Sequence, residues 1–481
     1  MQNKSGYLPK DQRKKILLLS DDMRLHSGIA TMARELVIQT AHHFNWVNLG
    51  GAMNHPDDKK AFDISADVDK QTGLEDSYVR LYATSGYGTA ELVRELIRTE
   101  KPDAILHFTD PRYWTWLYDI ERELRQTLPL MYLNIWDNYP SPLYNKSYYE
   151  CCDLLMGISK QTVNINQIVL GELAKTKQIR YVPHGINEES FYPIKKGTQE
   201  YDDLQETRKQ MFENEDPEFV VLWNSRNIRR KSPGDVILAY RQFCDQIGKE
   251  AAKKCALILH TQPVDQNGTD LYAVRDAICD PEYVKVYFSS ERLNASQMNV
   301  LYNIADVTML ISSNEGWGLS LTESMMTGTM IIGNVTGGMQ DQMRFVDENG
   351  EWYTPNPKIP SNHMGTYKEH GEWAIPVFPS NISLVGSVPT PYIHDDRCDF
   401  RDIAQAIKEV YELPKEERER RGMAGHDWVR SDEAKMTAAA MGANIADCME
   451  EAFSSFVPRP KYDLTKIETL PSKYVKHAMV Y

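Results

Sequence analysis

The clearest chemical signal in this sequence is a glycine-rich stretch between residues 307 and 323. An apolar run at 307–311 predicts a buried strand, and a helix is predicted from Leu319 onward. Between them, Gly316 and Gly318 allow the backbone to approach a ligand closely. The unpaired N–H groups at the start of a helix attract a phosphate. We therefore predict an anion site at the amides that open this helix, those of Trp317, Gly318 and Leu319.

Two glutamates belong to the same stretch, Glu315 in the loop and Glu323 in the first turns of the helix. Their separation suits one carboxylate to a sugar and the other to a ribose, because each accepts hydrogen bonds from hydroxyl groups. An ordinary strand–loop–helix unit with solvated glutamates is the alternative. The glycines of the stretch, together with a later Gly337-Gly338 pair, favour the functional interpretation.

A basic run, Arg226-Asn227-Ile228-Arg229-Arg230-Lys231, follows an apolar run at 219–223 that predicts a strand. Arg226 and Lys231 are spaced to straddle a diphosphate and to neutralise its charge as the leaving group departs. A basic run by itself is typical of a solvated surface. Its position after the first strand of a second predicted domain favours a diphosphate site.

The surrounding elements repeat one pattern twice. Apolar runs alternate with amphipathic helices, which predicts parallel sheets with helices on both faces. The fold class is therefore α/β, with two Rossmann-like domains. The predicted strands include 15–20, 46–49, 104–108, 130–134 and 154–158 in the first half, and 219–223, 255–260, 284–288, 307–311 and 330–333 in the second.

Changes in composition indicate the domain boundaries. The first domain is predicted over residues 1–190, and a polar, charged linker over 191–216. The second domain is predicted over 217–455. It includes a segment at about 352–400 that is rich in Pro, Asn and aromatic residues, and its lack of clear periodicity predicts an inserted loop.

Charge and composition exclude several classes of protein. A net charge of −14 on 481 residues argues against a chain that binds nucleic acid over its whole surface. A local basic groove is still compatible with this net charge. The sequence contains no apolar run of about 18 residues, so no membrane insertion is predicted. The polar, basic N-terminus is unlike a secretory signal. The 7 scattered cysteines indicate free thiols in a reducing cytoplasm and lack the spacing of zinc ligands.

Taken together, the motifs resemble the large retaining glycosyltransferase family of GT-B fold that includes bacterial glycogen synthase, sucrose synthase and phosphatidylinositol mannosyltransferase. That family carries an R-x4-K pair, here Arg226 and Lys231, and an E-x7-E block, here Glu315 and Glu323. A Gly-Gly turn follows, here Gly337-Gly338. The match extends from about residue 16 to residue 339, and two further segments contribute to it: Val182-Pro183-His184-Gly185-Ile186-Asn187 and Ser27-Gly28-Ile29-Ala30.

The resemblance implies a GT-B architecture, in which two facing Rossmann-like domains carry out the reaction in the cleft between them. The second domain is expected to hold the donor, a UDP-sugar, and the first to hold the acceptor. Retention at the anomeric carbon is expected, with no metal and no cofactor, and the tail at 456–481 is expected to cross back to the first domain. The implied catalytic residues are Arg226, Lys231, Glu315 and Asp137; the implied donor-binding residues are Gly28, Arg226, Lys231, Glu315, Gly316, Trp317, Gly318, Leu319 and Glu323.

The chain departs from the family at one wall of the cleft. The family often has a His where this chain has Trp136, and the next residue, Asp137, is the candidate to take over part of that role. His107 and Asp110 follow an earlier predicted strand, although a lone His is more often structural. The acceptor-side candidates are therefore His107, Asp110, Trp136 and Asp137.

Segments 18–28 and 84–88 also resemble predicted glycosyltransferases of large tailed bacteriophages. This likeness implies an enzyme of the host cytoplasm that sugars a hydroxymethylated pyrimidine in phage DNA and flips the base into its cleft. Alternative acceptors are a polysaccharide, a lipid-linked sugar or a small molecule. A non-catalytic nucleotide- or sugar-binding module is the alternative function, and the oligomeric state stays open. Basic residues proposed to hold the DNA backbone include Lys10, Arg13, Lys14 and Lys15.

Overall fold

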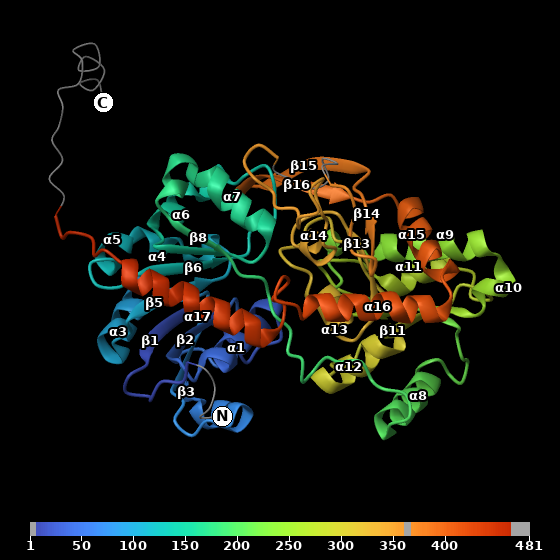
Figure 1. Cartoon of the computed structure of the whole chain (residues 1–481), viewed down its shortest axis with the longest axis horizontal. Coiled ribbons are helices and arrows are strands. Elements are labelled where there is room, and N and C mark those ends of the chain that lie inside the picture. Colours follow the sequence, from blue (N-terminus) through green and yellow to red (C-terminus); the bar gives the residue numbers. More distant parts are fainter. Residues whose placement is uncertain (1–5, 360–366, 463–481) are drawn as a thin grey trace, which may run out of the picture.

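The computed structural model describes residues 6–359 and 367–462. Two α/β lobes lie side by side, and each is built on one sheet with helices packed against it (Figure 1). The chain passes from the first lobe to the second after residue 181, and its last described helix returns to the first lobe. The α/β class and the two Rossmann-like domains predicted from the sequence are confirmed.

The sheet of the first domain has 8 strands in the order β3-β4-β2-β1-β5-β6-β7-β8. β3 runs antiparallel to β4, and the other pairs are parallel. The middle of β1, Ile16–Leu19, is fully buried because helices cover both faces of the sheet. The strands are β1 (Lys14–Asp21), β2 (Phe44–Ala52), β3 (Ala61–Asp63), β4 (Val79–Ser85), β5 (Ala104–Phe108), β6 (Leu130–Asn134), β7 (Leu154–Gly157) and β8 (Gln178–Tyr181).

The sheet of the second domain has 6 strands, all parallel, in the order β11-β10-β9-β12-β13-β14. The ligand-binding edge of such a sheet is the one where the strands end, so the loops after β9, β12 and β13 are the ones to examine. The strands are β9 (Phe219–Asn224), β10 (Cys255–His260), β11 (Val286–Ser289), β12 (Val307–Leu310), β13 (Met330–Asn334) and β14 (Ala374–Val377).

Helices flank both sheets. In the first domain they are α1 (Gly28–Thr40), α2 (Ser65–Thr72), α3 (Ala90–Glu100), the 3-10 helix η1 (Pro111–Trp114), α4 (Thr115–Asp119), α5 (Glu121–Leu124), α6 (Lys146–Cys151) and α7 (Lys160–Leu170). The rest of the chain contributes α8 (Gln199–Met211), α9 (Pro233–Ile247), α10 (Lys249–Ala252), α11 (Leu271–Ile278), α12 (Ala295–Ile304), α13 (Leu319–Met326), α14 (Met339–Gln342), α15 (Phe400–Glu412), α16 (Lys415–Val429) and α17 (Ala438–Ser455).

The predicted linker at 191–216 contains a helix, α8. Its Leu204 and the following Phe212 are buried in one cluster with Val220 and Leu222 of β9. The surface of α8 is otherwise charged, which is why composition alone suggests a linker. Because its apolar side chains pack on the second sheet, the segment belongs structurally to the second domain.

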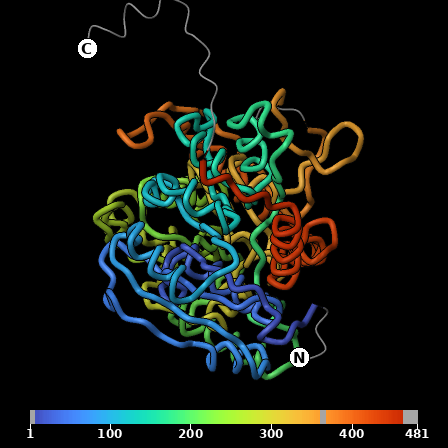
Figure 2. The backbone as a smooth tube through the Cα atoms, turned by 90° about the vertical axis from the view of Figure 1, so that its left-hand side faces the viewer, coloured from blue at the N-terminus to red at the C-terminus, as the bar shows by residue number. Residues whose placement is uncertain are grey.

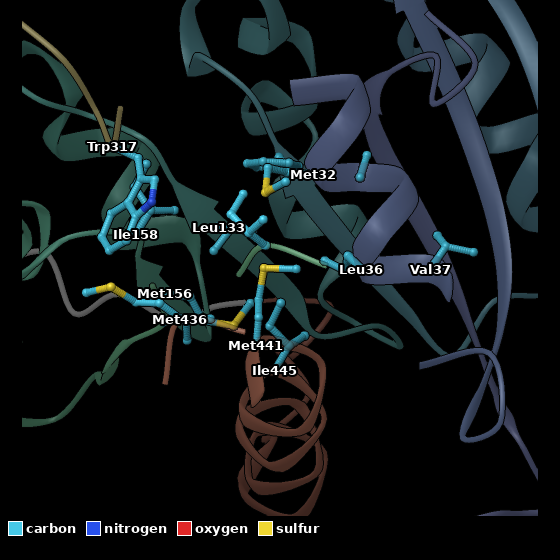
Figure 3. Packing of buried hydrophobic residues seen from close by; sticks show 14 of the residues in the cluster. Met32, Leu36, Val37, Leu133, Met156, Ile158, Trp317, Met436, Met441 and Ile445 are labelled. Atoms are coloured by element: carbon cyan, nitrogen blue, oxygen red, sulfur yellow. The ribbon is translucent and has the colours of Figure 1, made fainter. Parts of the chain in front are cut away.

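The return to the first domain occurs earlier than the sequence predicts. The predicted tail, 456–481, lies mostly outside the described residues, and the crossing is made by α17, which the prediction placed in the second domain. Met441 and Ile445 of α17 lie among side chains of the first domain, including Leu36 of α1 and Leu133 of β6 (Figure 3). Figure 2 shows this last helical segment in red beside the first lobe.

Chain segments far apart in sequence meet where α17 begins. The N–H of Ala438 donates to the carbonyl of Ile186, and the N–H of Ile186 donates to the carbonyl of Met436. A Cβ added at Gly185 would lie 2.1 Å from the carbonyl oxygen of Thr437, so only glycine fits there. The Pro-His-Gly segment at 183–185 therefore packs against the chain at the point where it returns to the first domain.

The predicted insertion at 352–400 is more regular than expected. It supplies β14, which completes the second sheet, and an antiparallel hairpin of β15 (Asn381–Ser387) and β16 (Thr390–Arg397). Figure 1 shows this hairpin above the junction of the two lobes. Most of β15 is exposed, so it lacks the apolar alternation that reveals a strand in a sequence.

A carboxylate of the second domain caps a helix of the first. Asp341 of α14 accepts a hydrogen bond from the backbone N–H of Lys160, the first residue of α7, over 2.8 Å. Beside it, the Gln340 amide donates to Gln161 over 2.8 Å. Burial raises the pKa of Asp341 to about 6, against a smaller lowering effect of the Lys160 ammonium. The two domains are thus joined by a buried acid whose charge depends on pH.

Replacing Asp341 with Asn is expected to change how stability depends on pH. Because the pKa of Asp341 is higher in the folded than in the unfolded protein, its contribution is most favourable in acid and is lost as the pH rises through about 6. We expect Asp341→Asn to gain stability relative to the wild type between pH 4 and pH 7, by up to roughly 3 kcal/mol. Urea unfolding of both proteins across this range measures the difference; a difference that stays constant with pH contradicts the expectation.

Candidate functional site

Two glycine loops pack against each other at the carboxyl edge of the second sheet. The N–H of Gly338 donates to the carbonyl of Glu315 over 3.0 Å. A Cβ at Gly338 would lie 2.2 Å from the carbonyl oxygen of Gly316, and one at Gly337 would lie 2.0 Å from that of Glu315. Gly337 also has a φ of +55°, which disfavours other residues. The Gly-Gly turn therefore shapes the loop that carries Glu315.

The N-terminus of α13 opens toward the first domain. Its N-cap is Gly318, with a φ of +91° and no side-chain cap, so no side chain competes for the amides at this end. A Cβ added at Gly28, the first residue of α1, would lie 3.5 Å from Leu319 Cδ1. The starts of α1 and α13 thus face each other across the domain boundary, and two predicted donor-site residues, Gly28 and Leu319, are brought together.

Lys231 and Glu315 form a buried ion pair in the same place. Lys231 is 8% exposed, and burial lowers the pKa of its ammonium, with the neighbouring Arg230 adding to the effect. Arg230 Nη1 lies 3.4 Å from the same Glu315 oxygen and donates to the carbonyl of Asn314 over 2.7 Å. Two cations therefore converge on one carboxylate beside the N-terminus of α13.

Arg226 is directed elsewhere. Its guanidinium pairs with Asp265 over 3.0 Å, and its side chain is 64% exposed. In this structure Arg230, rather than Arg226, lies beside Lys231 and Glu315. That Arg226 and Lys231 straddle a diphosphate stays a prediction. The loop after β10, which supplies Asp265, is remote in sequence, so the spacing of the basic run did not reveal this partner.

Glu323 lies on α13 and faces the end of β9. It accepts a hydrogen bond from the Tyr302 hydroxyl over 2.5 Å, and that hydroxyl accepts one from Asn224 over 2.7 Å. Burial raises the pKa of Glu323, and the Tyr302 hydrogen bond partly opposes it. Trp317, by contrast, is a core residue: it is 2% exposed and its indole N–H donates to Thr322 over 3.0 Å.

The first domain contributes Asp137, which follows β6. Burial raises the pKa of Asp137, while the positive charges of Arg230 and Lys231 lower it, so this carboxylate lies within electrostatic range of the two cations. Its backbone carbonyl accepts a hydrogen bond from Gln161 over 2.7 Å. Trp136, by contrast, is buried and donates its indole N–H to the Asn138 carbonyl over 3.1 Å.

The other two acceptor-side candidates support the fold. His107 is fully buried, and its ring nitrogens contact the Tyr118 hydroxyl at 2.8 Å and the Thr109 hydroxyl at 3.1 Å. Burial lowers the pKa of His107 to about 3, so it stays neutral. Asp110 caps η1 and forms an ion pair with Arg112.

The basic residues near the N-terminus are engaged within the protein. Arg13 pairs with Asp76 over 2.7 Å, Lys15 with Glu100 over 3.1 Å, and Lys14 with Glu450 of α17. They stabilise the first domain and do not form a free basic groove.

The sequence did not predict that the hairpin strand β16 is part of the site, because no motif marks it. The His394 carbonyl accepts hydrogen bonds from Asn138 of the first domain over 3.1 Å and from Asn314 of the second over 3.0 Å. Asp395 accepts from Asn314 over 2.9 Å and from Ser313 over 3.2 Å. One short strand thereby connects the loop before Glu315 with the cleft wall that carries Asp137.

Among the described residues we find neither a candidate metal site nor a candidate membrane-spanning helix. Among them, no group of three or more His, Cys, Asp and Glu side chains is arranged to hold a metal ion. Within residues 6–359 and 367–462, no helix combines the length and the apolar character that a membrane span needs.

Comparisons with known proteins agree with the fold. Residues 205–359 match the family model described as "Glycosyl transferases group 1". A solved structure of Anabaena HepE with UDP and glucose has a TM-score of 0.62 at 15% identity, covering 91% of this chain and 100% of that one. No curated protein sequence matches the chain.

Two further solved structures have the same architecture. Sucrose-phosphate synthase from Thermosynechococcus elongatus has a TM-score of 0.63 at 16% identity and covers 92% of this chain and 100% of its own. An α,α-trehalose-phosphate synthase from Burkholderia vietnamiensis has a TM-score of 0.60 at 11% identity, covering 91% and 99%. The predicted GT-B fold is confirmed by these likenesses.

Removing the carboxylate of Asp395 is expected to loosen the loop that carries Glu315. Asp395→Ala deletes two hydrogen bonds to Ser313 and Asn314, each contributing about 1 kcal/mol. We expect amide hydrogen exchange in a peptide spanning 311–318 to accelerate by about tenfold. Ser387→Ala, at the exposed end of β15, is the matched control and should leave this peptide unchanged. Equal exchange in wild type and Asp395→Ala would show that the hairpin does not hold the loop.

Proposed function

We propose that this chain, which carries a glycosyl transferases group 1 domain on a GT-B fold, transfers a sugar from a UDP-sugar to a hydroxyl acceptor with retention of anomeric configuration. The observation that carries the proposal is the group of Lys231, Arg230 and Glu315 at the open N-terminus of α13, opposite Asp137. Cations and helix amides suit a diphosphate, and carboxylates suit the hydroxyls of a sugar.

The donor is proposed to enter between the starts of α1 and α13. Its diphosphate takes the place of the Glu315 carboxylate beside Lys231, and Glu315 is then released to accept hydrogen bonds from the donor sugar. Glu323, supported by Tyr302, is assigned to the ribose. UDP-glucose is the first donor to test, because Anabaena HepE has been solved with UDP and with UDP-glucose.

In the transfer step, the bond between the anomeric carbon and the phosphate oxygen breaks. The acceptor oxygen forms its bond to the same face of that carbon, and the acceptor proton passes to the departing phosphate oxygen. Lys231 and Arg230 stabilise the charge that grows on the UDP, an interaction stronger in the transition state than in the ground state. Contacts between the domains hold the acceptor on the same face of the anomeric carbon as the departing phosphate.

A hydroxymethylated pyrimidine in DNA remains the prediction that the phage-like segments suggest. Arg13, Lys14 and Lys15, which were proposed to hold DNA, form ion pairs within the fold, so this acceptor has no support from them.

The first experiment is a panel of UDP-, GDP- and ADP-sugars, each offered with neutral sugars, with DNA containing 5-hydroxymethylcytosine, and with no acceptor. We expect UDP release from a UDP-sugar, accelerated by one acceptor, and an α-linked product by NMR when the donor is α-linked. Failure to turn over or bind any nucleotide sugar would refute the enzyme. Nucleotide binding without turnover would favour the non-catalytic binding module.

Lys231 is expected to act mainly on the rate. Lys231→Met removes a charge that stabilises the leaving UDP, and we expect kcat to fall by about 10²–10³-fold, with a smaller change in donor KM. Arg229→Met, an exposed cation of the same basic run, is the matched control and should retain activity. A Lys231→Met enzyme with wild-type kcat would remove Lys231 from the transfer step. Comparing Arg226→Ala with Arg230→Ala decides which arginine assists it.

A further inference from the structure

A cavity of about 350 Å³ lies where the first domain faces the second. The loops after β1, β2 and β4 line it with Asp21, Ser27, Met53 and Tyr87, and the second domain adds Arg292. The cavity is next to Gly28, which contacts Leu319 at the start of α13. A molecule in this cavity therefore lies beside the proposed donor site.

Resting on the function proposed above, we propose that this cavity binds the acceptor as a neutral sugar ring. Asp21 accepts hydrogen bonds from the ring hydroxyls, and the exposed face of Tyr113 packs on the ring's apolar C–H face.

Asp21 is positioned as a hydroxyl acceptor. It lies at the end of β1, where it accepts hydrogen bonds from the Ser27 hydroxyl over 2.6 Å and from the Tyr87 hydroxyl over 3.2 Å. Burial raises the pKa of Asp21, and these two hydroxyls partly oppose it. Each carboxylate oxygen has a second lone pair, so both can accept a further hydroxyl from a ligand. A poorly solvated carboxylate gains more from such donors than an exposed one.

The backbone is built to hold Tyr87 against this carboxylate. A Cβ at Gly51 would lie 2.3 Å from Tyr87 Cδ1, so only glycine leaves room for the ring on the end of β2. Tyr87 itself has a φ of +70°, a conformation that costs a non-glycine residue about 1 kcal/mol or more and is concentrated at functional sites. In this strained conformation the Tyr87 hydroxyl donates to Asp21.

Tyr113 provides an aromatic surface beside Tyr87, which lines the cavity. Its ring stacks on Tyr87 with centroids 5.2 Å apart and an angle of 24°, and the residue is 51% exposed. It belongs to η1, which the Asp110 cap orients. A large aromatic side chain with one face packed and the other in solvent is suited to a ligand with an apolar face.

The combination favours a neutral sugar over the other acceptor classes. A phosphorylated acceptor would bring its negative charge toward Asp21. A flipped base would stack on Tyr113 but offers one hydroxymethyl group in place of the several hydroxyls that a carboxylate between two O–H groups can receive. Arg292 supplies N–H donors for ring oxygens from the opposite domain.

The test separates the acceptor site from the donor site. Wild type, Asp21→Asn, Tyr113→Ala and Tyr113→Phe are each titrated with glucose, maltose, glucose 6-phosphate and 5-hydroxymethylcytosine DNA in the presence of UDP-glucose. We expect a neutral sugar to be the acceptor, with its KM raised at least tenfold by Asp21→Asn and by Tyr113→Ala. Tyr113→Phe keeps the ring and should bind the acceptor as the wild type does. Asp67→Asn, an exposed carboxylate of α2, is the matched control.

Two other measurements keep the outcomes distinct. UDP affinity by calorimetry should be the same in all variants, which shows that the second domain is intact. Saturation-transfer NMR with maltose reports sugar binding without any turnover, so it tests the cavity even if UDP-glucose is not a donor. The proposal is overturned if maltose and glucose bind equally to wild type and Asp21→Asn, or if only glucose 6-phosphate or only the modified DNA accepts sugar.

Discussion

The contact between the Gly337-Gly338 turn and the backbone of Glu315 and Gly316 is the constraint on which the cleft depends. No Cβ fits at either turn position, so the loops after β12 and β13 touch backbone to backbone. This contact places Glu315 against Lys231 and leaves the N-terminus of α13 open. The first domain faces it with the start of α1 beside Leu319 and with Asp137 near the two cations.

Charges in this cleft are balanced before any ligand arrives. Lys231 would be costly to bury alone, and its pairing with Glu315 offsets that cost. In the function proposed above, an anionic ligand replaces the carboxylate without leaving the ammonium unpaired. Such an exchange needs little reorganisation, which is what electrostatic catalysis requires.

The order and type of most elements could be predicted because they depend on local pattern. The apolar runs at 15–20, 307–311 and 330–333 correspond to β1, β12 and β13, which are buried on both faces. What could not be predicted depends on partners distant in the chain. Arg226 pairs with Asp265, and the hairpin that holds Asn314 comes some 80 residues later. No local sequence pattern indicates either contact.

Asp21 illustrates the same limit within the site. It belongs to a segment that the sequence marked for its family likeness, yet nothing in that segment assigns it a role. Its partner Ser27 is close in sequence, whereas Tyr87 is 66 positions away. Only the folded sheet brings the ends of β1 and β4 together, and with them the hydroxyls that surround the carboxylate.

The path of α17 has a consequence for how the protein is made. The apolar face that includes Leu36 of α1 is covered by the last described helix of the chain, so a ribosome must synthesise the entire second domain before the first can finish packing. Until then the nascent first domain exposes an apolar groove, which is a binding site for chaperones and a risk for aggregation. The first domain can therefore complete its packing only after the second has been synthesised in full.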